Sequence, residues 1–168
     1  MWLHPADGPA APDVADRKRH PVPANLPTQA TTEDILRRGS KSFHAASQLL
    51  PAVVRQDAAV LYAFCRLADD CIDDSTAPER GLQQVRAWVE AVFGAKQVTC
   101  RDVVHHPAET SLTQAQVLTV LCALRQVVQR HRLPKIAFLA LLEGFAWDVA
   151  GRRYASINDV HAYCVRVA

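Results

Sequence analysis

The sequence predicts an all-α protein with one folded domain. Apolar residues recur at three- and four-residue steps through most of the chain after residue 31, which is the spacing of one face of an α-helix. Threonines or prolines that suit a helix start precede several of these segments. No segment shows the alternation of apolar and polar residues that indicates a β-strand. A chain of 168 residues, 49% of them hydrophobic, can bury the core of one such domain.

The N-terminal part differs in composition from the rest. Residues 1–30 are rich in proline and alanine and lack apolar periodicity, so we expect a disordered leader before a domain over 31–168. Thr31-Thr-Glu-Asp34 places a capping threonine before acidic residues and predicts a helix over about 32–38. Gly39 is expected to end this helix.

A long helix is expected over residues 51–74. Pro51 suits its first turn, and Ser75-Thr-Ala-Pro78 breaks the pattern after it. Its apolar positions recur at helical spacing at Val54, Ala58, Leu61, Cys65 and Ala68.

Two helices with clear inward faces follow, over 79–93 and 113–131, separated by a polar loop over 94–111. The inward residues of the first are Leu82, Val85, Val89 and Val92. Those of the second are Val117, Val120, Leu121, Leu124 and Val128. His105-His106 in the loop has no partner at metal-ligand spacing and is interpreted as surface.

The helix predicted over 134–148 is apolar almost all round, so we expect it to be a buried central helix. Its acids are Glu143 and Asp148, and a charge in such a helix needs a partner or a wet cavity. Asp148 is therefore either a site residue or the ion-pair partner of Arg152 or Arg153. A final helix begins near residues 156–158 and continues to the end of the chain.

Composition excludes several classes of function. The net charge of +2 gives no general electrostatic case for binding nucleic acid. No run of 18 uncharged apolar residues predicts a transmembrane helix, and Asp7, Asp13 and Asp16 argue against a secretory or organellar leader. The five cysteines stand singly, so we expect reduced, buried thiols in a cytoplasmic protein.

The helix over 51–74 ends with four carboxylates in six residues. Residues four apart share a helix face at about 6 Å, so Asp69 and Asp73 point the same way, as do Asp70 and Asp74. These like charges repel, and acids at a helix C-terminus oppose the macrodipole. Two interpretations stay open: a solvated acidic face, or ligands for a hard divalent cation such as Mg2+.

Arg66 and Tyr62 lie on or near this acidic face. Arg66 would form a structural ion pair with Asp69 or Asp70, or would hold a phosphate oxygen beside a metal. Tyr62, one turn earlier, is either a core tyrosine or part of the same cavity.

Ser40, Lys41 and Ser42 follow a flexible glycine. Their hydroxyl, ammonium and backbone N–H groups near a helix start would suit an anion. The simpler interpretation, which the sequence favours, is a loop with a helix N-cap.

From about residue 31 to its end, the chain carries several motifs in an order that resembles the squalene/phytoene synthase family. Within that family it is most similar to the bacterial phytoene synthases. The motifs are Ser40-Lys-Ser-Phe43, Tyr62-Ala-Phe-Cys-Arg-Leu-Ala-Asp-Asp-Cys-Ile-Asp73, Leu142-Glu-Gly-Phe-Ala-Trp-Asp148, Gly151-Arg-Arg-Tyr154 and Ala162-Tyr-Cys-Val-Arg-Val-Ala168. The resemblance implies the all-α isoprenoid synthase fold, with its site in a central cavity between helices.

The resemblance also implies roles for individual residues. Asp69 and Asp73 would bind Mg2+, or Mn2+ in its place, together with a substrate diphosphate. Asp70 or Asp74 would lie next to these ligands without contacting the metal directly. The catalytic candidates are Asp69, Asp73, Arg66 and Tyr163. The substrate-binding candidates are Ser40, Ser42, Phe43, Tyr62, Arg66 and Asp148.

This chain departs from the family pattern in three places. Gly39 stands where some relatives have histidine, and Val165 stands where an aromatic residue is common. In the family, the last motif leads to Gly-x-x-Gly and a second Asp-x-x-x-Asp, neither of which this sequence contains. We therefore expect the N-terminal half of the domain, with little or no synthase activity by itself.

The activity that the resemblance implies is head-to-head condensation of two geranylgeranyl diphosphates to phytoene, with release of diphosphate. Two alternatives stay open: a squalene or dehydrosqualene synthase that uses farnesyl diphosphate, and a non-catalytic assembly protein on the same fold. The implied partner is a prenyl diphosphate, with peripheral membrane association for release of an apolar product and with no nucleic acid.

Overall fold

A computed structural model describes residues 28–73, 77–103 and 113–167 of the chain. Within these ranges all the regular secondary structure is helical, which confirms the predicted all-α class. The α-helices are α1 Thr28–Gly39, α2 Lys41–Ser47, α3 Ala52–Asp73, α4 Pro78–Phe93, α5 Gln114–His131, α6 Lys135–Val149 and α7 Ile157–Val167. A short 3-10 helix, η1 Cys100–Val103, lies in the segment predicted to be a loop.

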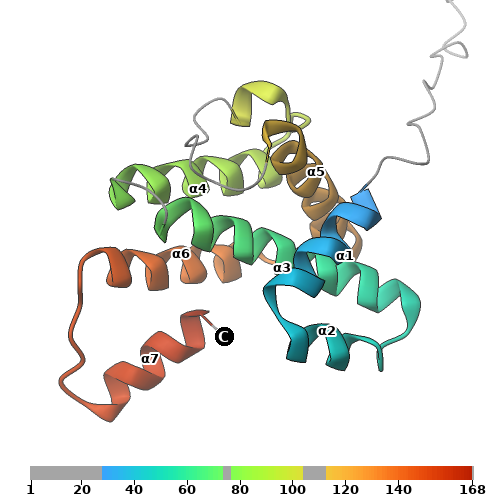
Figure 1. The fold of residues 1–168 in the computed structure, drawn as a ribbon. Coiled ribbons are helices and arrows are strands. Elements are labelled where there is room, and N and C mark those ends of the chain that lie inside the picture. Colours follow the sequence, from blue (N-terminus) through green and yellow to red (C-terminus); the bar gives the residue numbers. More distant parts are fainter. Residues whose placement is uncertain (1–27, 74–76, 104–112, 168) are drawn as a thin grey trace, which may run out of the picture.

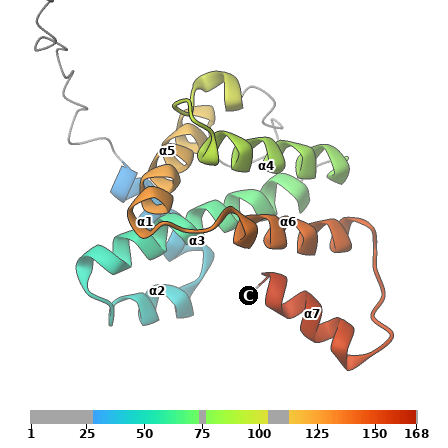
Figure 2. The same ribbon diagram turned by 180° about the vertical axis from the view of Figure 1, so that it is seen from behind.

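The long helix α3 lies in the middle of the described structure, with α1, α4 and α5 packed against it (Figure 1). Seen from behind, α4 and α5 cover one side of α3, and α6 and α7 lie toward the other (Figure 2). The core forms where α3, α4 and α5 meet, around the fully buried Phe64, Leu67 and Trp88. The inward faces predicted for α4 and α5 are confirmed, because their valines and leucines join this core.

The ends of α4 and α5 are fixed by polar contacts. Thr113 and Gln116 form a capping box at the start of α5, which satisfies backbone N–H groups that the helix leaves unpaired. At the C-terminal end of α4, the Arg125 guanidinium donates hydrogen bonds to the carbonyls of Val92 and Gly94 at 2.8 and 2.7 Å. A cation that binds the last carbonyls of a helix also complements its macrodipole.

Close approach of α3 and α4 depends on Gly81. A Cβ atom at this position would lie 2.4 Å from the Cys71 carbonyl oxygen and 3.0 Å from the Ile72 Cα. Both atoms belong to the backbone, which cannot move aside as a flexible side chain can. The absence of a side chain at Gly81 therefore sets the spacing of these two helices.

The structure selects one face of α3 and corrects the expected place of α6. The buried residues of α3 are Asp57, Ala59, Val60, Ala63, Phe64, Leu67, Ala68, Cys71 and Ile72, whereas Val54 and Cys65 are exposed. Because α3 is apolar on more than one side, two sets of residues have helical spacing, and the neighbouring helices select between them. The helix α6 is not the central one: it packs mainly on α4 and α7, and Ile136 is 69% exposed.

Three smaller differences concern single positions. The helix α1 begins at Thr28, four residues before the expected start, in a segment that includes the good helix formers glutamine and alanine. The prediction of buried thiols holds for Cys71 and is wrong for Cys65 and Cys164, which are exposed free thiols. Residues 1–27 of the expected leader, Asp74, and the pair His105-His106 lie outside the described residues.

None of the described helices is both long enough and apolar enough to cross a membrane.

Candidate functional site

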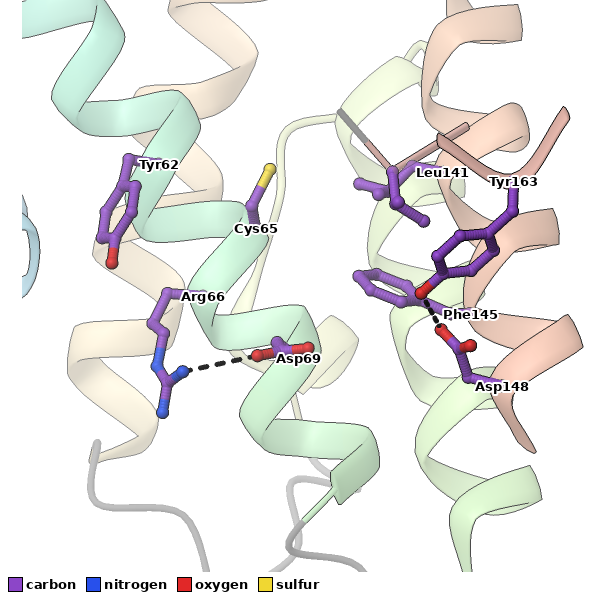
Figure 3. Close-up of a pocket in the computed structure, with 9 residues that line it drawn as sticks. Tyr62, Cys65, Arg66, Asp69, Leu141, Phe145, Asp148 and Tyr163 are labelled. Carbon is purple, nitrogen blue, oxygen red and sulfur yellow. Dashed lines mark hydrogen bonds and ion pairs between the residues drawn. The ribbon is translucent and has the colours of Figure 1, made fainter. Parts of the chain in front are cut away.

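A cavity of about 300 Å³ lies between α3 on one side and α6 and α7 on the other (Figure 3). Its lining residues are Tyr62, Cys65, Arg66 and Asp69 from α3, Leu141, Phe145 and Asp148 from α6, and Tyr163 and Val167 from α7. The charged residues lie toward the lower end in Figure 3, and Tyr62, Cys65 and Leu141 lie toward the upper end. The cavity therefore has a charged end and a largely apolar end.

The α3 wall follows directly from helix geometry. Each of its residues has another one three or four positions away, so they share one face of α3: Tyr62, Cys65, Arg66 and Asp69. The Arg66 guanidinium lies 2.6 Å from Asp70 Oδ1 and 3.4 Å from Asp69 Oδ2, which confirms the structural ion pair predicted for it. The Arg66 side chain is 47% exposed, so these pairs add little stability and its donors remain open to the cavity.

Negative charge accumulates at the charged end. Burial and the nearby Asp73 raise the pKa of Asp69 above its ordinary range, Asp70 and Asp148 add to this, and only Arg66 opposes them. Asp148 contributes from the facing helix α6, so like charges meet across the cavity as well as along α3. These neighbouring carboxylates make the ionised form of Asp69 less favourable, and a bound cation would reverse that effect.

The hydrogen-bond partner of Asp148 is Tyr163, and not Arg152 or Arg153, the ion-pair partners considered from the sequence. The Tyr163 hydroxyl of α7 donates a hydrogen bond to Asp148 Oδ2 at 2.7 Å, while Arg152 lies 3.9 Å from Asp159. This hydrogen bond, together with burial, raises the pKa of Tyr163 to about 12. The Tyr163 phenol therefore keeps its proton near neutral pH and fixes the orientation of the Asp148 carboxylate.

The helix α7 packs on α6, although none of its described residues is buried. Gly144 lets it approach, since a Cβ atom there would lie 2.5 Å from Val167 Cγ1. Arg166 lies 3.0 Å from Glu143 and also stacks over the Trp147 ring, 4.4 Å from its centroid. Polar and cation–π contacts thus hold the α7 wall of the cavity in place.

The hydroxyls near α2 do not line this cavity. Ser40 Oγ accepts a hydrogen bond from the Phe43 N–H at 3.2 Å and caps α2, which confirms the simpler interpretation of this segment. Ser42 lies beside it, with 3.4 Å between the two hydroxyl oxygens. Phe43 reaches the site indirectly, because its ring stacks on Tyr62 with centroids 5.4 Å apart. A role for Ser40 and Ser42 in holding diphosphate stays a prediction.

The sequence interpretation missed four lining residues: Cys65, Leu141, Phe145 and Val167. A signal existed for the α6 wall, because Leu141, Phe145 and Asp148 are separated by four and three residues and share a face. The same rule places Cys65 one turn before Asp69. Desolvation of the Cys65 thiol in the cavity wall, together with the Asp69 charge, raises its pKa, so Cys65 contributes a neutral surface to the cavity.

The residues at the charged end are of the type that binds a divalent cation, but they supply only some of the ligands that such a cation needs. Carboxylates are the ligands that Mg2+ prefers, and the mutual repulsion around Asp69 favours a positive charge there. However, no three acidic, histidine or cysteine residues within the described ranges converge as a ready metal site. A cation held by Asp69 and Asp73 would therefore complete its shell with water and ligand oxygens, as Mg2+ commonly does.

Comparison with known proteins gives concordant matches. The family model of squalene/phytoene synthase matches residues 36–168. The phytoene synthase of Rhodobacter capsulatus is 38% identical over 138 residues, which cover 80% of this chain and 35% of that protein. The phytoene synthase of Cereibacter sphaeroides is 36% identical over 145 residues, and the 15-cis-phytoene synthase of a Paracoccus species is 34% identical over 140.

The matched region is only part of these relatives. It covers 80% of this chain and 36% of the Cereibacter protein, and 82% of this chain and 42% of the Paracoccus protein. The chain thus spans 35–42% of the length of these curated relatives. No solved structure gives a significant match. With its carboxylate-bearing helix α3 inside the matched region, this chain belongs to the squalene/phytoene synthase family.

Proposed function

We propose that this chain provides one diphosphate-binding side of a phytoene synthase-like prenyltransferase. The reaction is head-to-head condensation of two geranylgeranyl diphosphates, with release of diphosphate. Relatives that are 34–38% identical to this chain are named phytoene synthases, which supports this substrate over farnesyl diphosphate. The observation that carries the proposal is the meeting of Asp69 and Asp148 across one cavity, beside the open donors of Arg66.

At the charged end, Asp69 and Asp73 would hold Mg2+ or Mn2+ against the substrate diphosphate. When bound, such a cation would offset the negative charge that develops on a departing diphosphate. The Arg66 guanidinium presents several donors in a planar fork and would hold a diphosphate oxygen directly. Its ion pairs with Asp69 and Asp70 orient it toward that position.

At the apolar end, side chains of α6 and α7 would surround the isoprenoid chain. Leu141, Phe145 and Val167 have no polar side-chain group and exclude water from this wall. An allylic cation formed there would be protected from capture by water. The Tyr163 phenol keeps its proton, so it holds Asp148 in place and does not compete as a phenolate.

Condensation requires more ligands than the described residues bring together. Because the chain spans only 35–42% of the length of the phytoene synthases it matches, we propose that residues 1–168 bind a metal-diphosphate complex weakly and do not turn over substrate by themselves. The preserved acids Asp69, Asp70 and Asp73 argue against a purely structural assembly protein. Cytoplasmic location with peripheral membrane association, which would suit an apolar product, stays a prediction.

The experiment that tests the proposal is isothermal titration of the 168-residue chain with inorganic diphosphate, with and without Mg2+. We expect saturable binding that needs Mg2+ and that is lost in the double variant Asp69→Ala, Asp73→Ala. Asp34→Ala removes an exposed carboxylate of α1 and serves as the control, with unchanged binding. Equal binding by the double variant and the wild-type chain would contradict the site.

A second measurement addresses turnover. Incubation of the chain with Mg2+ and geranylgeranyl diphosphate, followed by extraction and chromatography, should give no phytoene. Phytoene formation would overturn the proposed inactivity, and conversion of farnesyl diphosphate in its place would overturn the proposed substrate.

A further inference from the structure

Gly39, the last residue of α1, is in close contact with Tyr62 in the cavity wall. A Cβ atom at Gly39 would lie 2.4 Å from the Tyr62 hydroxyl oxygen and 3.1 Å from Cε1 and Cζ of its ring. The requirement for glycine is one of space, since the glycine with a positive φ among the described residues is Gly151. Any side chain at position 39 must therefore move the Tyr62 ring.

The surroundings of Tyr62 limit where its ring can go. A tyrosine ring is rigid and moves as a unit about two side-chain torsions. Phe43 of α2 stacks on the ring with an interplanar angle of 23° and a centroid distance of 5.4 Å. Gly39 lies against the hydroxyl end of the ring, and the ring itself lines the cavity. A ring displaced from Gly39 therefore changes the shape of the cavity wall.

Tyr62 lies at the apolar end of the cavity. It precedes Asp69 by seven residues, which corresponds to about 10 Å along the helix axis. Figure 3 shows Tyr62 and Cys65 at one height on α3, and Asp69 and the Arg66 guanidinium lower down. A diphosphate held at Asp69 and Arg66 would thus leave its hydrocarbon chain to pass the Tyr62 ring.

We propose that Gly39 is a positioning residue, which acts through Tyr62 to set the width of the cavity where it receives the isoprenoid chain. This inference rests on the proposed function of the cavity and adds a determinant of substrate selectivity to it. A larger residue at position 39 narrows the apolar end and leaves the charged end unchanged. Affinity for the hydrocarbon chain should fall while affinity for the diphosphate group is retained.

The test compares two ligands on the 168-residue chain and its Gly39→Ala variant. The ligands, each with Mg2+, are inorganic diphosphate and an unreactive thio-analogue of geranylgeranyl diphosphate. We expect Gly39→Ala to weaken binding of the prenyl ligand about tenfold, the size of effect that overpacking commonly produces, with no change for inorganic diphosphate. Gly94→Ala, at the C-terminus of α4 and outside the cavity lining, is the matched control.

A second background shows whether the effect passes through Tyr62. The change Tyr62→Phe removes the atom that lies 2.4 Å from the added Cβ and leaves only the contacts at 3.1 Å. Gly39→Ala should therefore cost much less prenyl affinity in the Tyr62→Phe background than in the wild-type background. The same comparison covers the case in which Gly39→Ala alone unfolds, because the double variant relieves the contact and should fold and bind the prenyl ligand.

The outcomes distinguish failure of the role of Gly39 from failure of the proposed function. Absence of binding of both ligands by the wild-type chain would contradict the proposed function itself. If the wild-type chain binds both ligands, an equal loss for both in Gly39→Ala would show a general structural role and overturn the inference. Unchanged prenyl affinity, or a loss of the same size in the Tyr62→Phe background, would also overturn it.

Discussion

Asp57 joins α3 to the last turn of α5, and its removal should destabilise the fold measurably. Arg130 Nη1 donates to both carboxylate oxygens at 2.7 and 2.9 Å, and His131 Nε2 lies 2.7 Å from Oδ2. The Asp57 side chain is only 10% exposed, whereas Arg130 and His131 are 52% and 44% exposed. The perturbation that tests this junction is Asp57→Ala.

The expected magnitude follows from these exposures. Removing one partner of a fully buried pair costs about 3–5 kcal/mol, because an unpaired charge remains buried. Here the cations left behind by Asp57→Ala are half exposed and regain water, so we expect about 2 kcal/mol. For a chain of this size, that loss corresponds to a fall of about 4–8 °C in Tm.

The pH dependence of the same variant gives a second measure. Burial alone raises the pKa of Asp57, but hydrogen bonds from His131 and Arg130 and their charges outweigh it, so the pKa lies below the ordinary value. The folded pKa is depressed, and the stabilisation is therefore present above the ordinary carboxyl pKa of about 4 and lost as pH falls through the folded value. The difference between wild type and Asp57→Ala should shrink as the solution is acidified through that window.

The assay is urea unfolding followed by far-UV circular dichroism, at neutral pH and at several acidic pH values. Asp34→Ala is the control, because Asp34 pairs with Arg37 and Arg38 at exposed positions of α1 and should contribute well under 1 kcal/mol. A destabilisation by Asp57→Ala of less than about 0.5 kcal/mol would contradict a stabilising role for this junction, since that is the range of ordinary surface substitutions.

Three further predictions test the packing and the cavity. Gly81→Ala should lower the free energy of unfolding by about 1–3 kcal/mol in urea, because its Cβ would meet the Cys71 backbone; an unchanged midpoint would contradict this. Asp148→Asn should lower the pKa of Tyr163 from about 12 toward its ordinary value in a spectrophotometric titration, and a pKa that stays near 12 would contradict the hydrogen bond. Thr113→Ala removes the side-chain cap of α5 and should lower the free energy of unfolding in urea by about 1 kcal/mol. Thr113→Ser keeps the hydroxyl group and should lower it less; an equal loss in both variants would contradict the capping role.

Much of the secondary structure follows from local sequence signals. The helices α4 and α5 begin and end within a residue of the predicted limits, because proline or threonine starts them and a regular apolar face runs through each. The acidic end of α3 is equally local, since helical periodicity alone places Asp69 and Asp73 on one side. The pairing of Arg66 with these acids is local for the same reason.

The buried faces of α3 and α6 could not be predicted in this way. Both helices have apolar residues on several sides, so spacing permits more than one inward face. On α3, packing of α1, α4 and α5 selects the face that contains Phe64 and Leu67 and leaves Cys65 to the cavity. The ion pairs of Asp57 were not predicted either, since its partners lie 73 and 74 residues away in the chain.

Local sequence patterns thus predict the helical class, the limits of most helices and the acidic face of α3. Packing of distant segments places Asp148 across the cavity from Asp69, gives it Tyr163 in place of an arginine as its partner, and brings Gly39 against Tyr62. The difference arises from the sequence separation of the residues that interact. Helix formation depends on neighbours within a turn or two, whereas a cavity depends on side chains that only packing brings together.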